Sequence, residues 1–195
     1  MIDIRTLTGT QVEPYLDAVA ALRIAVFRDW PYLYDGDADY ERKYLATYAN
    51  SARSLFVLAF DGARIVGAST GIPLADEVEN FQKPFAARGI ALRDVFYFGE
   101  SVLLGDWRGQ GLGHRFFDER ENYARRLGGF ALTGFCSVER SPDDPRRPPA
   151  YRGNDAFWIK RGYVRQDDMF CELEWKEINE PEPSRKRLRF WLRDL

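Results

Sequence analysis

Three glycines at alternate positions of one short turn limit most strongly what this chain can fold into. The turn, Gly109-Gln110-Gly111-Leu112-Gly113, follows an apolar run at 95–104 and precedes a stretch at 112–127 with apolar residues three or four positions apart. The first pattern predicts a strand and the second an amphipathic helix. Glycine adopts the left-handed backbone that such tight turns often require. The sequence therefore predicts an α/β protein with a glycine-rich strand-to-helix turn.

A turn of this kind suits phosphate. Its backbone N–H groups stay accessible at the positive end of a helix, and Arg108 and His114 add side-chain donors. Two common phosphate motifs are excluded. No Lys-Ser/Thr pair follows, as a Walker A loop requires, and the Gly-x-Gly-x-Gly spacing after about the fourth strand differs from a dinucleotide fingerprint.

The rest of the chain reads as one α/β domain over 1–195, a length that allows a substantial core. Strands are expected at 2–7, 54–60, 64–72, 95–104, 130–138, 169–176 and 186–194, and helices at 10–27, 38–48, 112–127 and 154–161. The segment 76–93 is expected to be irregular. The alternation of Leu188, Phe190 and Leu192 with arginines predicts a last strand with one buried face. It would complete the sheet, with Glu172 and Glu174 facing Arg187 and Arg189.

Composition narrows the class of protein. The formal charge is −2, from 28 basic and 30 acidic residues, so we expect neither a nucleic-acid nor a membrane partner. The two cysteines and the lone histidine form no zinc-ligand pattern, so we expect no metal. The N-terminus lacks a signal-peptide core, and no apolar run approaches the ~20 residues that span a bilayer. We therefore expect a cytoplasmic globular protein.

The turn also resembles a known family motif. Arg108-Gly109-Gln110-Gly111-Leu112-Gly113 is similar to the acetyl-CoA motif Arg/Gln-x-x-Gly-x-Gly/Ala of the GNAT superfamily. Trp158-Ile159-Lys160-Arg161-Gly162-Tyr163 resembles the end of that family's fourth helix, and the order of elements resembles the family over nearly the whole chain. The resemblance implies a mixed α+β fold with a mostly antiparallel sheet of about seven strands and about four flanking helices. It also implies direct transfer of an acetyl group from acetyl-CoA, a co-substrate, to a primary amine.

The same resemblance implies how the cofactor is held. The pyrophosphate would sit on the amides from Gly109 to His114, and the pantetheine arm would pair with the preceding strand like an added strand. The cofactor-binding residues implied in this way are Val102, Leu103, Leu104, Arg108, Gly109, Gln110, Gly111, Leu112, Gly113 and His114.

Acetyl transfer to an amine needs a group that accepts a proton. Glu100 is the candidate, because the family often carries a catalytic glutamate on this strand. Strand alternation places it on one face with Phe96, Phe98 and Val102, where an apolar setting suits proton transfer near neutrality. The departing thiolate is protonated in many members by a tyrosine of the fourth helix.

That tyrosine position holds Trp158 here, whose indole is no useful acid. Tyr151 is the candidate replacement, with water as the other option. Cys136 is expected to be a small buried thiol and not a nucleophile.

The acceptor itself is not named by the sequence. Tyr32, Tyr34 and Asp35 lie in the loop between the first two helices, where the family often builds its acceptor pocket, and they suit an amine through cation–π and charge contacts. A small molecule and a peptide both stay open, as do a homodimer and exchange of the last strand between subunits. A non-catalytic CoA-binding or regulatory domain is the alternative function, consistent with Trp158.

Overall fold

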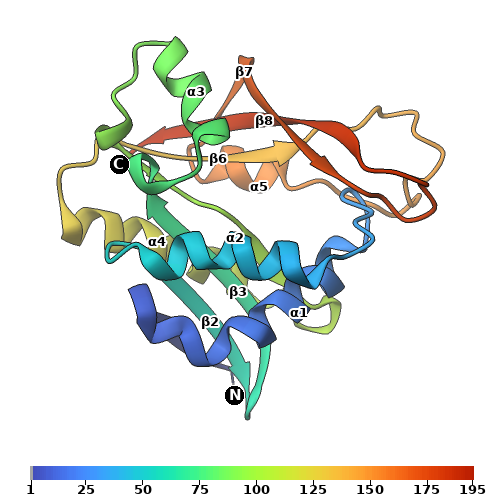
Figure 1. Cartoon of the computed structure of the whole chain (residues 1–195), viewed down its shortest axis with the longest axis horizontal. Coiled ribbons are helices and arrows are strands. Elements are labelled where there is room, and N and C mark those ends of the chain that lie inside the picture. Colours follow the sequence, from blue (N-terminus) through green and yellow to red (C-terminus); the bar gives the residue numbers. More distant parts are fainter. Residues whose placement is uncertain (1) are drawn as a thin grey trace.

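The computed structural model describes residues 2–195, and its strands form one twisted sheet (Figure 1). The strands lie in the order β1 (Asp3–Leu7), β2 (Leu55–Asp61), β3 (Arg64–Pro73), β4 (Val95–Tyr97), β6 (Leu132–Val138), β8 (Ser184–Asp194) and β7 (Val164–Trp175), and β5 (Ser101–Leu103) pairs with β3. Every pairing is antiparallel except that of β4 with β6. The predicted mixed, mostly antiparallel α/β fold is confirmed.

Helices cover both faces of the sheet, and each face has its own apolar cluster. The helices are α1 (Leu16–Phe27), α2 (Ala38–Asn50), α3 (Glu79–Ala87), α4 (Leu112–Leu127) and α5 (Asp155–Lys160). Residues of α1, α2 and α3 belong to one cluster, whereas α4 and α5 pack with the other. Among residues 2–195, no helix combines the length and the apolar character that a bilayer crossing requires.

The segment expected to be irregular contains α3. Its Phe81 and Phe85 are four positions apart and both buried, which is the helical signal. Pro84 hid that signal, because a proline removes a backbone donor and normally stays in the first turn of a helix. The expectation for 76–93 was therefore wrong. The helix expected at 10–27 begins as a 3-10 helix, Gly9–Tyr15, which is followed by α1.

The strand expected over 95–104 is broken into β4 and β5. Ser101 pairs with Ser69 and Tyr97 with Ile72, so three residues on this strand face two on β3, which defines a β-bulge. Gly99 allows it, because a Cβ there would lie 2.1 Å from the hydroxyl oxygen of Tyr48.

The bulge reverses the alternation of side chains. Phe96 and Phe98 pack on the α4 face, but Glu100 and Val102 point to the α1–α2 face. The expectation that all four share a face was wrong.

The tail strand β8 lies between β6 and β7 in the same chain. Its Leu188, Phe190 and Leu192 are buried, as the alternation predicts, but Trp191 is buried too and packs on Trp158 and Phe135. The second face of β8 is buried where Trp158 of α5 covers Trp191. The prediction of one buried face was therefore incomplete.

The register of the tail differs in part from the expectation. Glu172 faces Arg187, but Glu174 faces Arg185, and Arg189 lies opposite Phe170. Arg189 instead pairs with Glu139 at 2.9 Å.

Truncation after Pro183 should leave the protein insoluble or greatly destabilised. Burial of Leu188, Phe190 and Leu192 contributes roughly 1.5–3 kcal/mol each, a large share of a typical total stability. Thermal melting by circular dichroism is the measurement, with Arg187→Ala as the control for lost charge, since Arg187 is exposed. A truncated chain that melts like the full one would show that the strand is dispensable.

Candidate functional site

The glycine turn forms the N-terminus of α4. Gly109 and Gly111 have φ of 76° and 82°, and a Cβ on either would meet nothing within 4 Å. Glycine is needed here for its left-handed backbone, and the space beside the turn is open. Within the described residues, none of the amides from Gly109 to His114 donates a hydrogen bond, whereas Arg115 N–H donates to the Gly111 carbonyl. The turn thus presents a row of free donors.

The surroundings of these amides also suit an anion. The first turn of α4 contains no acidic residue, so nothing opposes the positive end of the helix dipole. Arg108 is exposed and its Nε donates to the Leu103 carbonyl at 2.9 Å. His114 is exposed, and its Nδ1 lies 3.3 Å from a guanidinium nitrogen of Arg161. The Gln110 side chain turns back to the Asp106 carbonyl. Phosphate oxygens fit this combination of amides and basic side chains.

Next to the turn, β5 has one unpaired edge. β4 pairs with β6, but β5, which follows β4 after the bulge, pairs only with β3. β5 and β6 therefore separate after the bulge. The Glu100 carbonyl and the Leu104 N–H bond to β3. Backbone groups alternate along a strand, so those of Ser101 and Leu103 point to the free edge. Of the residues expected to pair with an extended ligand, Leu103 points its backbone groups to this edge, where its carbonyl accepts from Arg108, whereas those of Val102 and Leu104 point to β3. Ser101 also points its backbone groups to the free edge.

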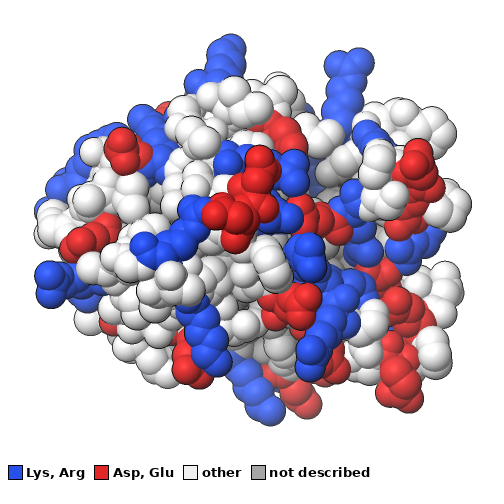
Figure 2. All heavy atoms as spheres, turned by 90° about the horizontal axis from the view of Figure 1, so that it is seen from above, with Lys and Arg blue, Asp and Glu red and all other residues white. Residues whose placement is uncertain are grey.

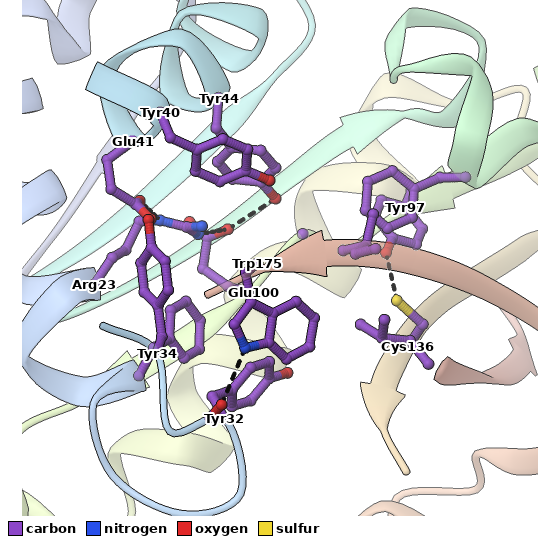
Figure 3. Close-up of a pocket in the computed structure, with 15 residues that line it drawn as sticks. Arg23, Tyr32, Tyr34, Tyr40, Glu41, Tyr44, Tyr97, Glu100, Cys136 and Trp175 are labelled. Carbon is purple, nitrogen blue, oxygen red and sulfur yellow. Dashed lines mark hydrogen bonds and ion pairs between the residues drawn. The ribbon is translucent and has the colours of Figure 1, made fainter. Parts of the chain in front are cut away.

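A pocket with a volume of about 80 Å³ lies where β5 and β6 separate. Figure 3 shows the residues that line it. Gly99 and Glu100 of the bulge and Cys136 of β6 line its inner side, and α1, α2 and β7 form other walls. The charged lining residues are Arg23, Glu41 and Glu100. The aromatic ones are Phe27, Tyr32, Tyr34, Tyr40, Tyr44, Phe81, Tyr97 and Trp175.

Glu100 is held from one side only. Its Oε2 lies 2.5 Å from Arg23 Nη1 and accepts from the Tyr44 hydroxyl at 3.1 Å. Its Oε1 is buried and has no hydrogen-bond partner among residues 2–195. The carboxylate therefore has one oxygen held in place and one free to accept a proton. Figure 3 shows Glu100 beside Arg23 and Tyr44.

Arg23 joins the two pocket carboxylates. Its Nε donates to Glu41 Oε2, and its guanidinium carbon lies 4.2 Å from the ring centre of Tyr44. Burial lowers the pKa of Arg23, but the negative charges of Glu100 and Glu41 outweigh it and the net shift is well upward. Burial raises the pKa of Glu41, although Arg23 acts in the opposite direction. The Arg23 charge is thus stabilised by the two acids.

A chain of hydroxyls leads away from Glu100. The Tyr44 hydroxyl, whose single proton goes to Glu100, lies 3.1 Å from the Tyr48 hydroxyl, and Tyr48 donates to Glu77. Burial raises the pKa of both tyrosines well above the usual value, and it also raises the pKa of Glu77. The sequence analysis predicted the helix at 38–48 that carries Tyr44 and Tyr48 but missed this connection. Their spacing of four, shared with Tyr40, was the available signal.

The loop between α1 and α2, residues 28–37, is called the acceptor loop here because the predicted acceptor residues lie in it. Two of those three residues lie at the pocket. Tyr32 and Tyr34 line it, whereas Asp35 lies outside the lining and pairs with Lys176 at 3.1 Å. Arg140 fixes the loop, because it donates to the Pro31 carbonyl at 2.6 Å and pairs with the buried Glu177 at 2.6 Å. Sequence reasoning missed this clamp, which joins distant segments.

Tyr151 lies outside the pocket lining. Its ring contacts Trp30 at 6.1 Å and has the Arg147 guanidinium 5.8 Å away. Burial raises its pKa, while Arg147 and Arg108 act in the opposite direction. Tyr151 therefore lies next to Trp30, in the loop between α1 and α2. Trp158 packs against Phe135 and Trp191 on the other face of the sheet.

Cys136 differs from its expected setting. It is only half-buried, lines the pocket, and lies 3.2 Å from the Tyr97 hydroxyl. Both cysteines are free thiols. Tyr97 is a pocket residue that sequence reasoning did not select. Within residues 2–195, no three side chains of metal-binding type are grouped together.

No protein-family profile matches the sequence, and no curated protein matches it. Solved structures do match over the whole chain. An acetyltransferase of the GNAT family from Streptococcus pneumoniae is 14% identical, with a TM-score of 0.55 and full coverage of both chains. The Drosophila melanogaster polyamine N-acetyltransferase, which forms N-acetylagmatine, is 14% identical, with a TM-score of 0.60 and full coverage of both chains. yncA from Salmonella typhimurium, solved with acetyl-CoA, is 11% identical over 100% of this chain and 94% of its own, at a TM-score of 0.57.

At these identities the likeness establishes the fold. The chain has the fold of the GNAT acetyltransferases, as the glycine motif and the order of elements predicted.

Proposed function

We propose that this protein is an N-acetyltransferase that moves an acetyl group from acetyl-CoA directly to a primary amine. The observation that carries the proposal is the juxtaposition of two features. Glu100, with one oxygen free, lies in a pocket at the point where β5 and β6 separate. The free edge of β5 leads from there to the open amides of the glycine turn.

The residues present fit acetyl-CoA. The amides from Gly109 to His114, with Arg108, would hold its pyrophosphate, and the backbone of Ser101 and Leu103 would hold its extended arm. When bound, acetyl-CoA would supply the thioester whose acetyl group is transferred to the amine.

Glu100 would act as the general base. Its Oε1 accepts a proton from the ammonium of the acceptor, so the nitrogen gains a free electron pair. That nitrogen forms the C–N bond to the acetyl carbon as the C–S bond breaks, and it passes its second surplus proton to water. Tyr151 donates a proton to the sulfur and regains one from water. Arg23 and Tyr44 hold the other carboxylate oxygen and so orient the base.

Release of free thiol from acetyl-CoA in the presence of amines tests the proposal. The alternative, a non-catalytic CoA-binding domain, is favoured by Trp158 at the position of the usual tyrosine and predicts CoA binding without thiol release.

Tyr151→Phe should lower kcat by roughly 10²-fold, the lower end of general acid–base effects, because the tyrosine lies at the edge of the site. The affinity for acetyl-CoA should stay unchanged. Steady-state kinetics is the measurement, and Tyr123→Phe on α4 is the control, since that tyrosine packs on Phe96 away from the pocket. An unchanged kcat would assign the sulfur proton to water.

A further inference from the structure

We propose that the acceptor is a monoamine, in which a single ammonium is attached to an apolar or aromatic body without a carboxylate beside it. This rests on the proposed function, since it specifies the acceptor of that reaction. The starting point is the charge of the pocket. One arginine and two glutamates line it, which leaves one net negative charge.

Arg23 is already neutralised by the two pocket carboxylates. Its Nε faces Glu41 and its Nη1 faces Glu100. The rings of Tyr44 and Phe27 pack against the guanidinium at 4.2 Å and 5.1 Å from their centres. An acceptor carboxylate at the remaining nitrogen, Nη2, would therefore be a third negative charge beside one positive charge.

The other cations near the pocket are paired as well. Lys176 pairs with Asp35 at its rim, and Arg140 pairs with Glu177 behind the acceptor loop. Lys186, whose Nζ lies 5.5 Å from the centre of the Trp175 ring, pairs with Glu177 and Glu180. An amino acid would thus bring its carboxylate into the pocket with none of these cations free to neutralise it, which is costly.

The same lining favours one ammonium only. Glu41 Oε1 and Glu100 Oε1 are buried and have no hydrogen-bond partner among the described residues. They offer acceptors for the protons of one ammonium, and the pocket charge neutralises one cation. The remaining walls are largely aromatic, including Tyr32, Tyr40 and Trp175, as Figure 3 shows. Rings of this kind stack on an apolar body and on a cation near it, but they do not neutralise a second ammonium.

Three amines separate these features: phenethylamine, phenylalanine and agmatine. Phenylalanine is phenethylamine with an added carboxylate, and agmatine carries a second cation instead of an aromatic ring. At pH 8 with saturating acetyl-CoA, thiol release should give phenethylamine a kcat/KM at least about tenfold above both others, because an unpaired buried charge costs more than a kilocalorie. Calorimetry of the three amines with the unaltered protein in the presence of CoA, which carries no acetyl group to transfer, gives a second readout that needs no turnover.

Substitutions of pocket residues test whether the pocket causes the preference for phenethylamine. Glu41→Gln removes the net negative charge, so the preference for phenethylamine over phenylalanine should fall severalfold. Tyr40→Ala removes an aromatic wall that is partly exposed, so it should raise the KM for phenethylamine even if Glu41→Gln fails to fold. Asp39→Asn removes an exposed charge from the same helix outside the pocket and serves as the matched control.

The outcomes distinguish this inference from the proposed function. Equal or better transfer to phenylalanine or agmatine would overturn the monoamine assignment and leave the acetyltransferase intact. Selective binding of phenethylamine without thiol release from any amine would support the pocket assignment and reject the catalytic function. No binding of phenethylamine by calorimetry together with no transfer to it would overturn the assignment of the pocket.

Discussion

Replacing Gly111 with valine should weaken CoA binding by about a hundredfold or more while the protein stays folded. Gly111 has φ of 82°, a conformation that a β-branched residue resists, so the amides beside it would turn away from their common direction. Hydrogen bonds to a charged group contribute roughly 1.5–3 kcal/mol each, and the loss of two accounts for a change of this size. Isothermal titration with CoA measures the affinity, and circular dichroism checks the fold.

The chain offers a matched control for this substitution. Gly62, in the turn between β2 and β3, has φ of 59° and, like Gly111, no atom within 4 Å of a built Cβ. Gly62→Val therefore imposes a similar backbone strain away from α4 and should leave CoA affinity unchanged. Wild-type affinity in the Gly111→Val protein would show that the turn does not hold the pyrophosphate.

Replacing Glu100 with glutamine should lower kcat by roughly 10²–10⁴-fold with little change in affinity for acetyl-CoA. Glutamine keeps the shape of the side chain but does not accept the proton of the ammonium. The expected loss extends from pH 6 to pH 9, because the base itself is absent. Initial rates with an amine that the protein accepts, and titration with CoA, are the two measurements.

Glu41→Gln separates the base from its structural contacts. It removes the other carboxylate of Arg23 while leaving Glu100 in place. We expect it to change the KM for the acceptor far more than kcat. If both variants lose kcat equally, Glu100 acts only by holding Arg23. Normal turnover of the Glu100→Gln protein would also remove it from the chemistry.

Much of the fold was predictable because its signals are local. The helix at 112–127, the glycine turn before it and the hairpin of β2 and β3 follow from spacing and turn residues that lie next to one another in the chain. The tail strand was predictable for the same reason. Its second buried face was not, because Trp191 is covered by Trp158 of α5, a contact that alternation within one strand does not specify.

The candidate site was predictable only in parts. The family resemblance pointed to Glu100 and to the amides from Gly109 to His114. Tyr32 and Tyr34, from the loop between the first two helices, line the pocket. Asp35 lies outside the pocket, because Lys176 on the neighbouring segment pairs with it. The sequence around Asp35 does not predict that Lys176, which is distant along the chain, will pair with its carboxylate.

By itself, the sequence determined the type and order of most elements and the glycine-rich turn before α4. Those properties depend on backbone preferences and on periodicities of two or three to four residues. Only the tertiary structure decided which way Glu100 points and what it meets. The bulge at Gly99 depends on the close approach of Tyr48, and Arg23, Glu41 and Glu100 come together only when α1, α2 and β5 pack. Charges distant in sequence are paired by that packing, and no local pattern encodes it.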